Sequence, residues 1–148
     1  MKNFGNAAIV ILVLLSFIAS TSAATEPDDP CRDEGYKKSN RETRECYSRE
    51  QVRVTTETDS RANKIAYGLR QEARDFEARF PRTVVGEMLR RAASAVVRSQ
   101  KTWKIYSAQH CKAVEYTWTT GSGAGTAYER CMFQLGKERL GLLQSEFH

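Results

Sequence analysis

The chain has 148 residues, with 23 Lys and Arg, 18 Asp and Glu and a formal net charge of +5. Charges of both signs alternate along it, whereas a nucleic-acid-binding surface needs clustered basic side chains with interleaved aromatic residues. The composition therefore disfavours nucleic acid as a partner. Four oppositely charged pairs have the i,i+4 spacing that supports an exposed helix face: Arg41 with Glu45, Glu45 with Arg49, Asp75 with Arg79, and Glu87 with Arg91.

Residues 1–24 have the layout of a secretory signal peptide. Lys2 precedes an apolar run over residues 7–19, and small residues follow, so that cleavage is expected after Ala23 or Ala24. The run is shorter than a membrane-spanning helix needs to be. No cysteine stands at the cleavage point to carry a lipid. We expect a periplasmic or secreted mature chain without an integral membrane segment.

The four cysteines are expected to form two disulfides. An even number of cysteines in a short exported chain is typical of a disulfide framework. Neither a CxxC motif nor a Cys/His cluster at zinc spacing is present, so we expect no metal and no cofactor. Of the three possible pairings, the two local ones are favoured because each needs only one hairpin to close: Cys31 with Cys46, and Cys111 with Cys131. Each is expected to contribute on the order of 3 kcal/mol.

The mature chain is expected to begin with an irregular segment and one long helix. Residues 25–39 contain Pro27, Pro30 and several acidic side chains, a composition that favours irregular structure. A helix is predicted from about Asn40 to Phe80, and Pro81 ends it because the residue before a proline avoids helical geometry. Its apolar or small residues recur every three or four positions: Cys46, Val54, Thr58, Ala62, Ile65, Ala66, Leu69, Ala73 and Phe76.

A second helix is predicted after Thr83, which is placed to cap it. Its large residues form one stripe that is expected to be buried: Val85, Leu89, Ala92, Val96, Trp103, Tyr106, His110, Val114 and Trp118. Three glycines then provide a loop free to adopt positive φ: Gly121, Gly123 and Gly125.

A third helix is predicted from about Thr126 to Phe147, and the Cys111 to Cys131 disulfide would close the glycine loop before it. Its expected apolar side contains Tyr128, Cys131, Met132, Leu135, Leu142 and Leu143. The predicted fold is all-α, a small disulfide-stapled bundle of three main helices over residues 40–148, with a long first helix and a helix-loop-helix C-terminal half.

One motif gives a family resemblance. The pattern Trp103-x-x-Tyr106-x-x-x-x-Cys111, a glycine-rich turn, and Cys131-x-x-x-Leu135-x-x-x-Arg139-x-x-x-Leu143 resembles the lysozyme inhibitor LprI-like family of bacterial envelope proteins. Upstream, Cys46, Asp59 and Asn63 are similar to the first helix of that family. The resemblance covers most of the mature chain.

The chain departs from the family pattern at several positions. Members usually carry an arginine and an acid after the aromatic residue at Tyr106 and another acid before the cysteine, where this chain has Ser107, Ala108 and His110. Ala62 and Gly136 replace a usual leucine and threonine. A charged network between the second and third helices is therefore expected to be partly missing, which leaves Arg139 without its usual partner on the second helix.

The resemblance implies a binding protein that inhibits lysozyme. Such an inhibitor must block a cleft lined by catalytic carboxylates, so a loop with a basic, hydroxyl or imidazole group is the natural plug. The candidates are Ser122 in the glycine loop and Lys37 and Lys38 in the N-terminal segment. Without Lys2 the chain has 22 basic and 18 acidic side chains, a net charge of about +4. This charge opposes long-range attraction to a strongly basic lysozyme.

The alternative is an envelope interaction or structural module with no lysozyme role. Trp103 and Tyr106 would then belong to the core, and Arg139 would offset a helix C-terminal dipole or form an internal salt bridge.

An enzyme is disfavoured. No strand precedes the glycine-rich segment, so it matches neither a nucleophile elbow nor a phosphate loop. The two histidines, His110 and His148, leave no acid-base pair for Ser122.

Overall fold

The structure is a computed structural model that describes residues 29–31, 39–81, 83–118, 121 and 123–147. The chain divides into two compact units, Met1–Pro30 and Cys31–His148, and the three helices belong to the second. The expected signal peptide and most of the expected irregular segment lie outside the described residues. The described part contains helices and no strand, which confirms the all-α prediction. Within those ranges no helix combines the length and apolar character that a membrane crossing requires.

Helix α1 spans Asn40–Arg79 and begins with a capping box. The Ser39 hydroxyl accepts a hydrogen bond from the Glu42 backbone N–H at 3.2 Å, and the Glu42 carboxylate accepts one from the Ser39 N–H at 2.7 Å. The helix ends one residue before the expected Phe80, ahead of Pro81. Its buried residues lie four or seven positions apart, in agreement with the predicted period: Tyr47, Val54, Thr58, Ala62, Ala66 and Ala73.

Helix α2 spans Val84–Thr117 and follows Thr83, whose side chain makes no capping hydrogen bond. The predicted buried stripe of this helix is wrong at several positions, because Val85 is 36%, Tyr106 54% and Trp118 55% exposed. Mostly small residues face the core instead: Gly86, Ala93, Val96, Gln100, Ser107 and Cys111. Small side chains let two helices approach closely, since the interaxial distance is set by the residues at the contact.

Helix α3 spans Ala124–Ser145 and buries Met132, Phe133, Gly136 and Leu143. Leu142 was expected on the apolar side but is 53% exposed, whereas Phe133 is only 2% exposed. Phe133 packs in a cluster with Cys31, Tyr47 and Val54.

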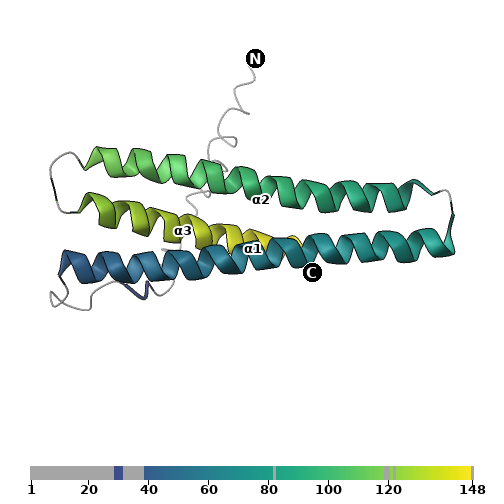
Figure 1. Ribbon diagram of the computed structural model, residues 1–148, viewed down its shortest axis with the longest axis horizontal. Coiled ribbons are helices and arrows are strands. Elements are labelled where there is room, and N and C mark those ends of the chain that lie inside the picture. Colours follow the sequence, from purple (N-terminus) through teal and green to yellow (C-terminus); the bar gives the residue numbers. More distant parts are fainter. Residues whose placement is uncertain (1–28, 32–38, 82, 119–120, 122, 148) are drawn as a thin grey trace, which may run out of the picture. The chain divides into compact units, whose positions relative to one another are not determined.

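Figure 1 shows α1 and α2 side by side as a long hairpin, with the shorter α3 packed along one half of it. Leu143, near the end of α3, packs with Ala62 of α1 and Val96 of α2, and Leu69 and Phe147 flank this cluster. Because α3 ends there, α1 and α2 continue beyond it to the turn at their far end. The molecule thus has a three-helix end and a two-helix end.

Candidate functional site

A polar network joins all three helices around the motif residue Arg139. Arg139 on α3 donates hydrogen bonds to the Gln100 amide oxygen at 3.1 Å and to the Ser99 hydroxyl at 2.8 Å. Gln100 donates to one Asp59 carboxylate oxygen at 2.9 Å, and Lys104 Nζ lies 2.7 Å from the other. Gln100 and Ser99 thus supply neutral partners on the second helix, where Arg139 makes no ion pair with any described residue.

The electrostatics of this network suit a structural role. Burial alone would raise the pKa of Asp59, but hydrogen bonds from Lys104 and Gln100 and the Lys104 charge together hold it below its usual value. Burial lowers the pKa of Arg139, which makes no ion pair with any residue that the structure describes. Carboxyl and guanidinium groups titrate far from neutral pH. The network therefore holds the helices in register, and a proton-transfer role does not follow from it.

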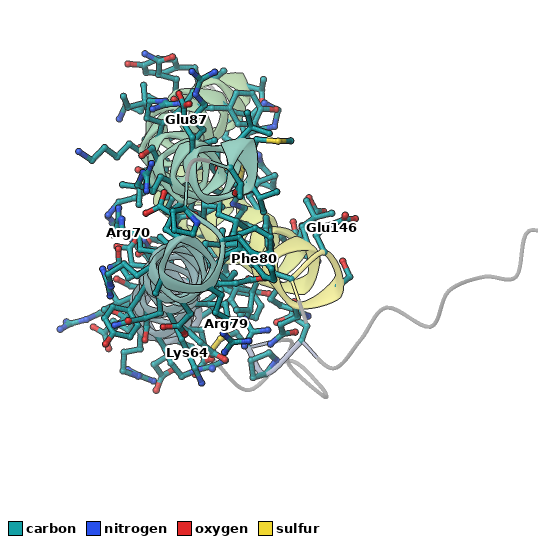
Figure 2. The ribbon with its side chains drawn as sticks, turned by 90° about the vertical axis from the view of Figure 1, so that its right-hand side faces the viewer. Lys64, Arg70, Arg79, Phe80, Glu87 and Glu146 are labelled. Carbon is teal, nitrogen blue, oxygen red and sulfur yellow. A yellow bond between two sulfur atoms is a disulfide. The ribbon has the colours of Figure 1, made fainter. Side chains whose placement is uncertain are left out.

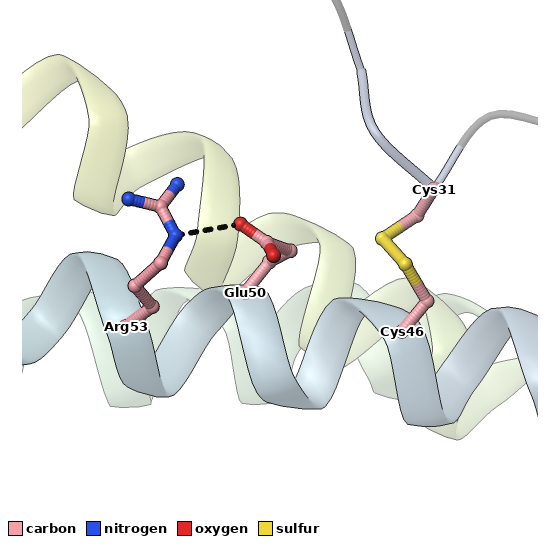
Figure 3. The surroundings of a disulfide bond; sticks show 4 residues. All are labelled: Cys31, Cys46, Glu50 and Arg53. Carbon is pink, nitrogen blue, oxygen red and sulfur yellow. Dashed lines mark hydrogen bonds and ion pairs between the residues drawn. A yellow bond between two sulfur atoms is a disulfide. The ribbon is translucent and has the colours of Figure 1, made fainter.

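The disulfide between Cys31 and Cys46 attaches the start of the second unit to the first turns of α1. Its Cα atoms are 5.7 Å apart. Figure 3 shows it beside the Glu50 to Arg53 ion pair, one turn further along the helix, where the two side chains are 2.9 Å apart. The predicted pairing is confirmed.

The disulfide between Cys111 and Cys131 joins α2 to α3 on either side of the glycine loop. The Cα atoms are 5.5 Å apart and the residues are 20 positions apart in the sequence. This second predicted pairing is also confirmed, and no cysteine of the described chain is free. Within the same described residues, no three His, Cys, Asp or Glu side chains gather in a way that would hold a metal ion.

The described glycines of this loop serve close approach. The sequence leaves this loop free to adopt positive φ, but none of Gly121, Gly123 and Gly125 has a φ in the left-handed region. A Cβ at Gly123 would lie 3.1 Å from the Trp118 ring, and one at Gly125 would lie 2.7 Å from the Arg44 guanidinium carbon. Both glycines thus admit a large side chain against the start of α3.

An aromatic row follows the outer side of α2 toward this loop, with residues every four positions: Tyr106, His110, Val114 and Trp118. The Tyr106 and His110 rings stack with centroids 5.6 Å apart. Tyr106, His110 and Trp118 are exposed, and Val114 is half-buried. The sequence pattern placed all four in the core, so the exposure of Tyr106, His110 and Trp118 is a correction. We call these four residues the aromatic row.

A groove of about 450 Å³ runs between the aromatic row and α3, and we call it the α2–α3 groove. Its α2 side consists of His110, Val114 and Trp118. Its α3 side consists of Ala127, Arg130, Cys131, Gln134, Leu135 and Glu138. The Cys111 to Cys131 disulfide borders it and fixes the spacing of its two walls.

The other residues singled out in the sequence have different positions. Ser122, Lys37 and Lys38 lie outside the described residues, so their role as a plug stays a prediction. Trp103 is half-buried, and Leu143 is 2% exposed and belongs to the core.

Gln100 and Lys104 were not predicted as members of the polar network around Arg139. The only sequence signal for Gln100 is its seven-residue spacing from the small residues Ala93 and Ser107.

These features define a small, disulfide-bonded, all-helical protein with a groove between α2 and α3 at its three-helix end. The family model for the lysozyme inhibitor LprI matches residues 31–143, and the chain belongs to this family. The family is one of inhibitors, which act by binding and not by catalysis. Neither a search of curated proteins nor a search of solved structures found a match.

Proposed function

We propose that this protein is exported to the cell envelope, where it binds a lysozyme non-covalently and inhibits it. Family membership supports the inhibitory role. The observation that carries the choice of site is the exposed aromatic row beside a disulfide that joins two helices. Two disulfides are also in keeping with an oxidising compartment outside the cytoplasm.

The three-helix end has the chemistry of a binding anchor. Tyr116 is 69% and Trp118 55% exposed, and tryptophan and tyrosine are the side chains that most often dominate binding energy. Lys112 lies 5.3 Å from the Tyr116 ring centroid and 2.7 Å from the Glu115 carboxylate, a partner that a carboxylate of the lysozyme cleft would have to replace. Because the Cys111 to Cys131 disulfide restrains this end, little conformational entropy is lost on binding.

The net positive charge bears on the rate of binding more than on its strength. A basic inhibitor and a basic lysozyme repel each other at long range, and salt screens that repulsion. Contacts made by Trp118 and Tyr116 are short-ranged and apolar, so they persist in salt. Inhibition is therefore expected to be retained or improved as ionic strength rises.

The test is inhibition of a C-type lysozyme acting on a cell-wall suspension, with the oxidised mature protein at two ionic strengths. Trp118→Ala is expected to raise the inhibitory concentration roughly tenfold or more. Tyr67→Ala is the matched control, since Tyr67 is 61% exposed but lies on α1. Equal loss in both variants would remove the α2–α3 groove as the site, and no inhibition by the unmodified protein at large molar excess would contradict the function itself.

A second candidate function rests on the opposite end of the molecule. Phe80 is 54%, Val84 70% and Met88 64% exposed around the turn between α1 and α2. A group of exposed large apolar side chains is typical of an interaction surface. An envelope interaction module without a lysozyme role would use this end, and alanine substitutions there would then affect partner binding while lysozyme remained fully active.

A further inference from the structure

One face of α1 carries a sequence of charges that is complementary to its own reverse. Successive residues of this set are four, three, four, four, three and four positions apart, so the spacing is the same whether the set is read forwards or backwards. At 3.6 residues per turn, all members stay within about 80° of arc on the helix surface. We call this set the α1 charge stripe: Glu57, Arg61, Lys64, Gly68, Glu72, Asp75 and Arg79.

The α1 charge stripe lies along the open side of α1. Figure 2 shows Lys64 and Arg79 on the side of the helix that faces away from α2. Two hollows of about 470 and 480 Å³ follow the stripe past the end of α3, and both are lined by Gly68 and Glu72. A Cβ at Gly68 would meet no atom within 4 Å, so the middle of the stripe is unobstructed.

Four of the charged members are available for new partners. Lys64, Glu72, Asp75 and Arg79 are exposed and make no ion pair within the described ranges. The Asp75 to Arg79 pair that the i,i+4 spacing predicted is thus not formed. The other two charged members already have partners, since Glu57 lies 3.3 Å from Arg53 and Arg61 donates a hydrogen bond to the Phe147 carbonyl oxygen at 2.9 Å.

We propose that the α1 charge stripe is a homodimer interface in which α1 packs antiparallel against α1 of a second copy. With the two-fold axis at Gly68, Lys64 faces Glu72 of the second copy, and the symmetry repeats this contact. The same register places Arg61 opposite Asp75. It also places Glu57 opposite Arg79, so that six oppositely charged contacts form.

A second copy fits this surface better than an unrelated partner. The stripe has three basic and three acidic residues and therefore no net charge to attract a strongly acidic or basic protein. Every charge of the stripe meets a charge of opposite sign when the partner helix carries the same series of charges and runs in the opposite direction. Gly68 at the centre permits close approach of the two helices. Phe76 and Phe80, which line the second hollow with their rings 5.1 Å apart, add apolar surface to the contact.

Charge reversal tests the register. Lys64→Glu creates two like-charged contacts in the dimer, and Glu72→Lys does the same, so each single variant is expected to dimerise roughly tenfold or more weakly in sedimentation equilibrium. The double variant K64E/E72K restores opposite charges and is expected to recover the dimer. An equal mixture of the two single variants is expected to form a heterodimer, because every Lys and Glu at these positions then meets its opposite.

Two controls separate this proposal from folding and from lysozyme binding. Arg70→Glu changes an exposed residue on another face of α1 and is expected to leave the dimer unchanged. The Lys64→Glu variant should keep its helical circular dichroism and its lysozyme inhibition, since the α2–α3 groove does not include α1. An unmodified chain that is monomeric at several hundred micromolar would overturn the proposal, and so would a double variant as weak as the single ones.

Discussion

Arg139 on α3 donates a hydrogen bond to the amide oxygen of Gln100 on α2 at 3.1 Å, so a half-buried guanidinium is held by an uncharged partner. Gln100 is only 5% exposed and also donates to Asp59 on α1. One neutral side chain therefore satisfies both an anion and a cation. Its removal takes one hydrogen bond from Arg139 and one from Asp59, which keep only their bonds to Ser99 and Lys104.

Gln100→Met is expected to lower the free energy of unfolding by about 1–3 kcal/mol, because the volume is kept while both hydrogen bonds are lost. Urea denaturation of the oxidised protein measures this. Gln144→Met, at an exposed position of α3, is the control and should change stability by less than about 0.5 kcal/mol. Equal effects of the two substitutions would show that the network contributes nothing to stability.

The low pKa of Asp59 predicts a specific loss of stability in acid. Its folded-state pKa lies below the unfolded value, because hydrogen bonds from Lys104 and Gln100 and the Lys104 charge outweigh the effect of burial. This contribution is fully present above the unfolded pKa of about 3.9 and is lost as the pH falls through the folded value. Asp59→Asn should therefore be less stable than the unmodified protein at pH 7 and nearly equal to it at the lowest pH at which both fold. A constant difference across thermal melts from pH 7 to pH 3 would contradict this.

Glu129 is expected to affect stability in the opposite direction from Asp59, because its ionised form destabilises the fold. Burial raises its pKa, Arg44 partly offsets this, and Glu115 adds to it. A carboxyl whose folded pKa exceeds the unfolded one destabilises the fold when ionised, and this penalty disappears as the pH falls through the folded and then the unfolded value. Glu129→Gln should therefore raise the melting temperature at pH 7 and have little effect below pH 4. A melting temperature lowered at pH 7 would instead indicate that the Arg44 contact dominates.

The features that follow local rules were predictable from the sequence. The Cys31 to Cys46 and Cys111 to Cys131 pairs each close one short loop, and Pro81 ends α1 where the steric rule for prolines places the end. The three-to-four-residue period of α1 gave its buried face, because both neighbouring helices pack against that side. No tertiary information is needed for any of these features.

The face of α2 was not predictable in the same way. Hydrophobic periodicity predicts that large residues such as Tyr106 and Trp118 are buried. The residues that α2 buries are mostly small ones such as Gly86 and Ala93, which allow close contact with α1. The large residues are left at the surface, where Trp118 lines the candidate site. The role of Gln100 was not predicted for a related reason, since the family pattern placed the charged residues after Tyr106 and before Cys111 and gave no role to position 100.

Close helix packing at Gly136 gives the last prediction. A Cβ at this position would lie 2.8 Å from Val54 Cγ1, so that α3 or the Val54 side chain must shift. Gly136→Ala is therefore expected to lower the free energy of unfolding by about 1–3 kcal/mol, despite the better helix propensity of alanine. Gly141→Ala is the matched control on the same helix: its Cβ would meet nothing within 4 Å, so it should raise stability by about 0.5–1 kcal/mol. Val54→Ala removes the clashing methyl group, and the double variant should be more stable than the sum of the single effects predicts. Additive effects in urea denaturation would show that the Gly136 to Val54 contact does not set the distance between α1 and α3.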